Sequence, residues 1–377
     1  MAISRILARA ATRAGAALDR GALRVMTRAM SRSGPRTTPH DARRRLLDLA
    51  EHYRGVDLFS PPPPPQVRER ERGDRVVDLS YRSAYSPSLA AYRKEYASYT
   101  ANLDVHARLF CGDEPRVPPP GKPGATPVIG GGDPRPPRPV AVLLHGWGGG
   151  NFWFEERAFP VDYLRRIGLD VVLFQLPFHG SRAPAQSPVS GSLFPSPHVV
   201  RTNEAFGQAI SDLRALAHYL RAHRGAPAVG VMGMSLGGYT SALWASLDSD
   251  LAFAIPLIPA VSMADLMWRH GENSPMRRRA QKLGVGRELL ADVFEAHSPL
   301  SMSPRVARDR LMIVAGKGDR IAPPDQARAL WEHWSRPRMF WFPGGHLAQV
   351  GRGDAFRAVR AHLADLGLAR RPGANVP

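Results

Sequence analysis

The sequence predicts an α/β fold with a mostly parallel central sheet, helices on both faces, a short helical cap and an N-terminal extension. Short apolar runs bounded by glycine or proline alternate with amphipathic stretches of ten or more residues. This pattern is typical of buried parallel strands joined by crossover helices. Several of the runs are followed at once by residues whose side chains can take part in catalysis. These positions are the carboxyl ends of the expected strands, where a sheet of this kind binds its ligands.

The expected elements follow one another along the chain. The apolar runs that predict parallel strands cover residues 139–144, 170–174, 228–232, 251–258, 311–315 and 339–342. An alternating run over residues 103–110 predicts an earlier strand of the same sheet. The stretches 89–99, 201–224 and 326–334 are expected to be helical. In the second of these, one stripe carries Phe206, Ile210, Leu213, Leu216 and Leu220.

The chain divides into a leading part, a folded domain and a short tail. Residues 1–100 are expected to form a basic, proline-rich N-terminal extension with amphipathic helices. Residues 101–368 are long enough to bury one large core, and 369–377 form the tail. Proline-rich tracts at 61–65 and 115–139 predict linkers or surface loops. The stretch 260–308, between two expected strands, is the candidate cap.

The tract from Gly233 to Gly237 has the GxSxG form of a nucleophile elbow. It leaves an apolar run and enters a helical pattern, as a strand-to-helix turn requires. A serine hydroxyl is a weak nucleophile at neutral pH, so Ser235 needs a tight turn and an adjacent base. Glycines on both sides of Ser235 give the turn the clearance that a side chain would remove.

An acid and a base follow the last two expected strands. Asp319 lies on the loop after residues 311–315, and His346 follows Gly344 and Gly345 after residues 339–342. The order serine, acid, histidine is that of α/β folds with a nucleophile elbow. Asp325 competes as the acid, but it follows two prolines and is typical of a helix start.

A glycine-rich loop after the run 139–144 is the candidate oxyanion site. It reads His145, Gly146, Trp147 and three further glycines. Two backbone amides are needed, one from Leu236 after the nucleophile and one from this loop, for which Trp147 is the candidate.

With these motifs in place, residues 100–368 resemble the α/β hydrolase superfamily, of the serine esterase and lipase kind. The resemblance rests on the motifs at 145–147, 233–237, 316–319 and 344–346. It implies that Ser235 attacks an acyl carbonyl, His346 moves the proton and Asp319 holds the histidine tautomer. It also implies that the amides of Trp147 and Leu236 bind the oxyanion during a two-step acyl-enzyme hydrolysis.

The same resemblance suggests where the substrate binds. Phe178 lies in a loop where the superfamily often has glycine, so it is expected to shape the pocket. Met263, Met267 and Trp268 in the candidate cap are expected to face the substrate, although such residues also serve as ordinary packing. His145 and His179 are expected to order loops at the mouth of the site.

The motifs leave the substrate and the reaction subclass open. Carboxylic esters, thioesters or lipid acyl groups fit, and acyl transfer on the same triad is the second enzyme hypothesis. The third is an idle hydrolase-like scaffold that binds a lipid or a protein. No cofactor is expected, because metal-ligand spacings and nucleotide-binding glycine motifs do not occur in the sequence.

Charge and cysteine usage bear on partners and location. The formal net charge is +18, and only four of the 51 basic residues are lysines. Without a nucleic-acid module or interleaved aromatics, we expect no nucleic-acid binding. Residues 1–30 form a basic amphipathic pattern that suits an anionic membrane surface and also resembles a mitochondrial transit peptide. The single cysteine, Cys111, favours a cytoplasmic location, peripheral to a membrane if that contact is made. The sequence does not decide the oligomeric state.

Overall fold

The computed structural model describes residues 2–31, 39–73, 75–112, 137–185, 187 and 189–371. In this part of the chain one nine-stranded sheet has the order β1-β2-β3-β5-β4-β6-β7-β8-β9. The strands are β1 (Arg68–Gly73), β2 (Val76–Arg82), β3 (Asp104–Phe110), β4 (Val140–Leu144), β5 (Asp170–Phe174), β6 (Val229–Met234), β7 (Ala254–Leu257), β8 (Met312–Gly316) and β9 (Arg338–Phe342). Strands β4 to β9 are parallel to one another, while β1, β2 and β3 join the β5 edge through antiparallel pairings, which confirms the mostly parallel sheet.

The middle of the sheet is buried on both faces. Strand β4 lies between β5 and β6, with Val142 opposite Val172 and Val231, and all five of its residues are buried. Successive side chains of a strand point to opposite faces, so β4 contributes alternately to two core clusters. This burial is the physical reason why the predicted strands are continuous apolar runs.

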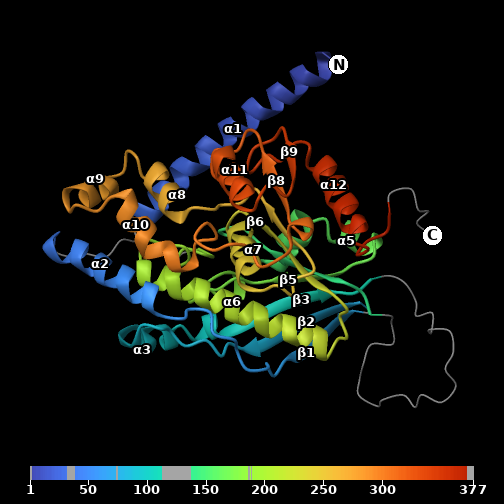
Figure 1. The fold of residues 1–377 in the computed structure, drawn as a ribbon, viewed down its shortest axis with the longest axis horizontal. Coiled ribbons are helices and arrows are strands. Elements are labelled where there is room, and N and C mark those ends of the chain that lie inside the picture. The colour runs from blue at the N-terminus through green and yellow to red at the C-terminus, as the bar shows by residue number, and fades with distance from the viewer. Residues whose placement is uncertain are drawn as a thin grey trace.

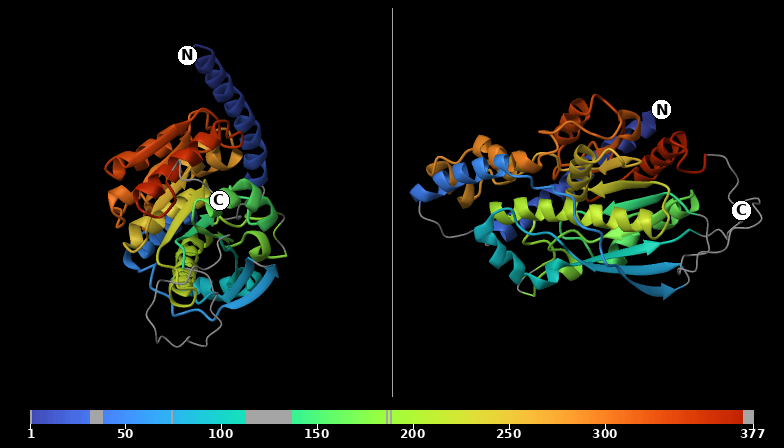
Figure 2. Two further views of the ribbon diagram at one scale, coloured as in Figure 1. Left: turned by 90° about the vertical axis from the view of Figure 1, so that its right-hand side faces the viewer. Right: turned by 60° about the horizontal axis from the view of Figure 1, so that its bottom comes forward.

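Helices cover both faces of the sheet (Figures 1 and 2). Residues of α6, α7 and α11 share one core cluster, and residues of α5 and α12 share the other. The helices outside the cap are α1 (Ala2–Ser31), α2 (Pro39–Gly55), α3 (Arg93–Ser98), α4 (Phe152–Ala158), α5 (Val161–Arg166), α6 (Val199–Ala222), α7 (Leu236–Leu247), α11 (Pro324–His333) and α12 (Arg352–Asp365). The predicted helix over 89–99 is a 3-10 turn, Ala90–Tyr92, followed by α3.

The candidate cap consists of three short helices between β7 and β8. They are α8 (Met263–His270), α9 (Pro275–Lys282) and α10 (Arg287–Phe294). Residues of α2 and α10 share a core cluster, so the leading part of the chain packs on the cap. No helix in the described ranges is long and apolar enough to cross a membrane.

The leading part of the chain also joins the sheet and covers α6. Strands β1 and β2 extend the sheet, while most residues of α6 are buried, including its polar Glu204 and Asp212. The Glu204 carboxylate accepts five hydrogen bonds, two of them from the hydroxyls of Tyr53 and Tyr85. Most of the predicted linker 115–139 lies outside the described residues, as do residues 372–377 of the tail.

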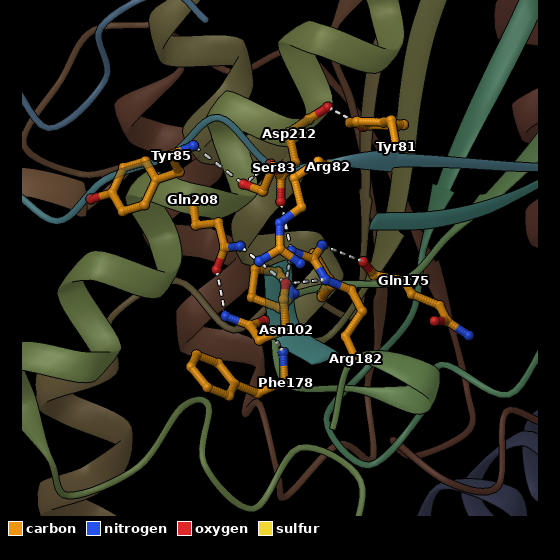
Figure 3. Close-up of polar contacts among 12 residues, drawn as sticks. Tyr81, Arg82, Ser83, Tyr85, Asn102, Gln175, Phe178, Arg182, Gln208 and Asp212 are labelled. Atoms are coloured by element: carbon orange, nitrogen blue, oxygen red, sulfur yellow. Dashed lines mark hydrogen bonds and ion pairs between the residues drawn. The ribbon is translucent and has the colours of Figure 1, made fainter. Parts of the chain in front are cut away.

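A buried ion pair joins the loop after β5 to α6 (Figure 3). Arg182 donates to Asp212 at 2.7 Å, and neither side chain is more than 1% exposed. Arg182 also donates to the carbonyls of Asn102 and Gln175, and Ser83 donates to Asp212 at 2.6 Å. The network therefore links four separate segments of the chain.

Removing Asp212 is expected to cost stability. In Asp212→Ala the Arg182 guanidinium stays buried without its counter-ion, so the free energy of unfolding should fall by about 3–5 kcal/mol. Urea denaturation followed by circular dichroism measures the change. The control is Asp104→Ala, because Asp104 and Arg82 form an exposed pair and should cost about 0–1 kcal/mol. Equal small losses in both variants would contradict the role given to Asp212.

Candidate active site

Ser235 occupies a strained turn between β6 and α7. Its φ is 56° and its ψ is −110°, a region that non-glycine residues rarely adopt. Conformations of this kind cost on the order of 1–3 kcal/mol and persist only where neighbouring structure enforces them. Here the Ser235 amide donates to the Leu257 carbonyl at 3.0 Å, and the Ser235 carbonyl accepts from Tyr239 and Ala260. Strand β7 and the first turn of α7 thus hold the elbow.

The glycines around Ser235 are required by close backbone approaches. A Cβ atom at Gly233 would overlap the Gly237 carbonyl, and one at Gly237 would overlap the Leu144 carbonyl. A Cβ at Gly238 would lie 2.9 Å from the Cα of Pro259. The clearance that the sequence predicted for the turn is confirmed by these contacts.

Asp319 and His346 form a buried hydrogen-bonded pair. His346 Nδ1 lies 2.7 Å from Asp319 Oδ2, with Asp319 1% and His346 7% exposed. The other Asp319 oxygen, Oδ1, accepts from the amides of Ile321 and Ala322 at 2.9 and 2.7 Å. These two amides fix the carboxylate so that Oδ2 faces the imidazole. With Nδ1 as the donor to this carboxylate, Nε2 is the ring nitrogen left to accept a proton.

The competing acid, Asp325, is elsewhere. It lies in the first turn of α11 and pairs with Arg269 at 2.7 Å, with both side chains exposed. The hydrogen bond from Arg269 lowers the pKa of Asp325. Asp319 is therefore the carboxylate that contacts His346.

The acid and base loops leave neighbouring parallel strands at one edge of the sheet. Asp319 follows β8 and His346 follows β9, while the elbow follows β6. The amide of Gly318 donates to the carbonyl of Gly344 at 2.9 Å, which ties the two loops together. The carboxyl ends of parallel strands are where such folds place their sites.

The loop after β4 passes close to the serine. A Cβ atom at Gly146 would lie 3.4 Å from the Cβ of Ser235. Trp147 anchors the loop, because its indole Nε1 donates to the Gly191 carbonyl at 2.7 Å. Leu236 is the first residue of α7, so its amide has no acceptor within the helix. Both amides predicted for the oxyanion site thus lie on segments adjacent to Ser235.

Two buried histidines support the loops at this edge. His145 Nε2 accepts from the Leu176 amide at 3.1 Å, and burial lowers the pKa of His145 to about 4. His179 Nδ1 lies 2.8 Å from the Pro177 carbonyl, and burial lowers its pKa well below the usual value. These contacts tie both rings to the loop after β5.

Glu155 is a loop support that the sequence analysis missed. Its carboxylate accepts from the amide of Gly150 at 3.0 Å and is buried. Burial raises the pKa of Glu155, and that hydrogen bond opposes the shift. An asparagine cap at Asn151 places Glu155 in the first turn of α4, directly after the glycines.

An apolar cavity of about 390 Å³ opens at Ser235. Its walls include Trp147, Leu236 and the three predicted cap residues Met263, Met267 and Trp268. Residues Leu46 and Leu49 of α2 also line it, although they lie almost 190 positions from the serine in the sequence. The cavity therefore combines the sheet edge, the cap and the leading part of the chain.

Phe178 is not among the residues that line this cavity. Its ring is fully buried and packs edge-on against Tyr96 and Tyr99. Its amide donates to Asn102 at 2.8 Å (Figure 3). The structure thus places Phe178 in the aromatic core beside α3 rather than on the cavity wall, which corrects the prediction from the sequence. Its φ of 62° lies in the left-handed region that favours glycine.

Comparisons with known proteins identify the family and the fold of the chain. The family model for alpha/beta hydrolase domain containing 18 matches residues 127–273. The uncharacterized protein Rv2627c of Mycobacterium tuberculosis is 31% identical over 322 residues, which span 83% of this chain and 70% of that protein.

Two solved structures share the fold along most of the chain. Acetyl xylan esterase 1 from Thermoanaerobacterium sp. superposes with a TM-score of 0.52 at 16% identity, over 89% of this chain and 96% of that one. Acetyl xylan esterase from Paenibacillus sp. gives 0.51 at 15% identity, over 88% and 97%.

Proposed function

Because the chain belongs to the α/β hydrolase superfamily, we propose that it is a serine hydrolase cleaving carboxylic esters through an acyl-enzyme on Ser235. The observation that carries the proposal is the buried hydrogen bond between Asp319 and His346, at the sheet edge where Ser235 occupies its strained turn. A nucleophile, an acid and a base in this chain order match the roles of a catalytic triad.

The proposed reaction has two steps. Ser235 Oγ attacks the acyl carbonyl while His346 Nε2 takes the hydroxyl proton and then donates it to the departing alcohol. Water next attacks the acyl-enzyme, giving its proton to His346, which returns one to Ser235 as the acid leaves. Asp319 holds the Nδ1–H tautomer throughout and stabilises the imidazolium. The amides of Trp147 and Leu236 would stabilise the oxyanion.

The cavity supports an apolar acyl group as the part of the substrate that is bound. Its walls are mostly aliphatic side chains, methionines and two tryptophans, so burying an alkyl chain there is favourable at about 25 cal/mol per Å². A lipid-like ester therefore fits better than a highly polar one. Turnover of aryl esters from acetyl to palmitoyl tests the proposal, and hydrolysis of none of them would contradict it.

Filling the part of the cavity that α2 lines should change the preference for acyl-chain length. In Leu46→Trp the larger side chain fills part of the cavity, so kcat/KM for the palmitoyl ester should fall by about tenfold or more. Activity toward the acetyl ester should stay within about twofold of the wild type. The matched control is Leu47→Trp, because Leu47 is exposed on the same helix. If Leu46→Trp lowers kcat/KM equally for both esters, or for neither, the cavity beside Leu46 does not bind the acyl chain.

A further inference from the structure

One stripe of α1 docks on the loops that carry the acid and the base. Thr12 Oγ1 donates to the Pro343 carbonyl at 2.7 Å, and Gly15 packs directly on Gly345, where its missing side chain allows the approach. The stripe continues with buried Ala16 and Asp19. Figure 1 shows the N-terminal end of this helix projecting beyond the rest of the molecule.

The outer face of α1 carries the positive charge. Arg9, Arg13 and Arg20 are exposed. Also exposed are Ala10, Ala14, Ala17 and Leu18, which belong to the apolar positions of the amphipathic pattern predicted for residues 1–30. The side chains of Ile3, Ile6 and Leu7 lie outside the described part of the chain. Docking thus uses a stripe of small residues and one acid, and leaves the basic face outside.

Asp19 bridges the two catalytic loops. Its Oδ2 accepts from the amide of Arg320 at 3.0 Å and from the amide of His346 at 2.8 Å. Its Oδ1 accepts from the amide of Leu347 at 3.0 Å. Arg320 directly follows Asp319, so one carboxylate binds both the base itself and the neighbour of the acid. Asp19 is fully buried, and these three amides satisfy a group that would otherwise be costly to bury.

We propose that Asp19 is a positioning residue of the active site and that α1 is part of the catalytic structure. The inference rests on the proposed function. Asp19 fixes the backbone of His346 relative to the acid loop, and thereby the direction in which the imidazole presents Nε2. Displacements of about 1 Å in catalytic geometry can cost 100-fold in rate.

The first test compares Asp19→Asn with Asp48→Asn in the full-length chain. Asparagine keeps one acceptor oxygen but turns an NH₂ group toward backbone N–H groups, so either the Leu347 amide or the amides of Arg320 and His346 lose their acceptor. Asp48 is exposed on α2, which makes it a matched control for the same chemical change. For each variant, a fluorophosphonate probe with intact-mass detection counts the molecules whose serine reacts. Steady-state hydrolysis of an aryl ester then gives kcat per reactive molecule, and KM.

Positioning and mere structural support predict different results. With positioning, kcat per reactive molecule should fall by about 10- to 100-fold in Asp19→Asn, with KM nearly unchanged because Asp19 does not line the cavity. A purely structural role would lower the reactive fraction and leave kcat per reactive molecule unchanged. A value within twofold of the wild type would therefore overturn the proposal.

A second pair of variants tests α1 without touching the carboxylate. A Cβ atom at Gly15 would lie 2.5 Å from the Gly345 amide nitrogen, whereas one at Gly21 meets nothing within 4 Å. Gly15→Ala should therefore reduce kcat per reactive molecule, and Gly21→Ala should not. Equal kcat per reactive molecule in Gly15→Ala and Gly21→Ala would contradict a catalytic role for α1. This comparison holds even if Asp19→Asn fails to fold. An unreactive wild type would overturn the proposed function, and the role of Asp19 with it.

Discussion

Ser235→Ala is expected to lower kcat for ester hydrolysis by about 10⁶-fold, because no other group can form the acyl-enzyme. Alanine keeps the Cβ atom and the same backbone restrictions, so the strained turn and its hydrogen bonds to Leu257 and Tyr239 should persist. The measurement is single-turnover and steady-state hydrolysis of an aryl ester, with circular dichroism to confirm the fold.

The control for this variant is Ser246→Ala. Ser246 is buried on α7, the helix that follows Ser235, and its hydroxyl donates to the Ala242 carbonyl at 3.1 Å. The Ser246→Ala variant lacks one hydroxyl of α7 but keeps the elbow intact, so its turnover should stay near that of the wild type. Ester hydrolysis that survives in Ser235→Ala would assign the nucleophile to another residue.

Asp319→Asn is expected to keep the fold and to lower kcat by about 10⁴-fold. The asparagine oxygen can still accept from the amides of Ile321 and Ala322, which leaves its NH₂ group facing His346 Nδ1. An NH₂ donor there forces Nδ1 to accept and moves the proton to Nε2. An imidazole protonated at Nε2 cannot take the proton of Ser235. Steady-state kinetics across pH 6–9 measures the loss.

Asp325→Asn is the matched control for the acid. Asp325 makes an exposed pair with Arg269, and such pairs contribute little to stability. Losing this ion pair in Asp325→Asn should therefore leave turnover within about twofold of the wild type. A 10⁴-fold loss in Asp325→Asn, with Asp319→Asn active, would reverse the assignment of the acid.

Much of this fold is predictable because local rules and tertiary structure agree. The run 170–174 coincides with β5, because its last four residues are apolar and are buried in a sheet that is covered on both faces. The elbow is visible in the sequence because the approach of Gly237 to Leu144 excludes a side chain. The pairing of Asp319 with His346 follows from the rule that loops after adjacent parallel strands meet at one edge.

Other features depend on contacts that no local pattern encodes. The predicted run 251–258 is longer than β7, because Leu251 and Phe253 are buried without belonging to the strand. The stripe on α6 predicts one buried face, yet long-range packing buries most of the helix. Leu46 reaches the cavity only through the packing of α2 on the cap. Asp19 was visible as the one acid of a basic helix, but nothing local indicates its partners.

The most direct test of the account is labelling of the purified wild-type chain with a fluorophosphonate, beside Ser235→Ala, with intact mass and peptide mapping. The account predicts one adduct per molecule on Ser235 and none in the variant, because Asp319 and His346 activate this serine alone. A folded wild type that takes up no adduct, or an adduct that persists in Ser235→Ala, would contradict it.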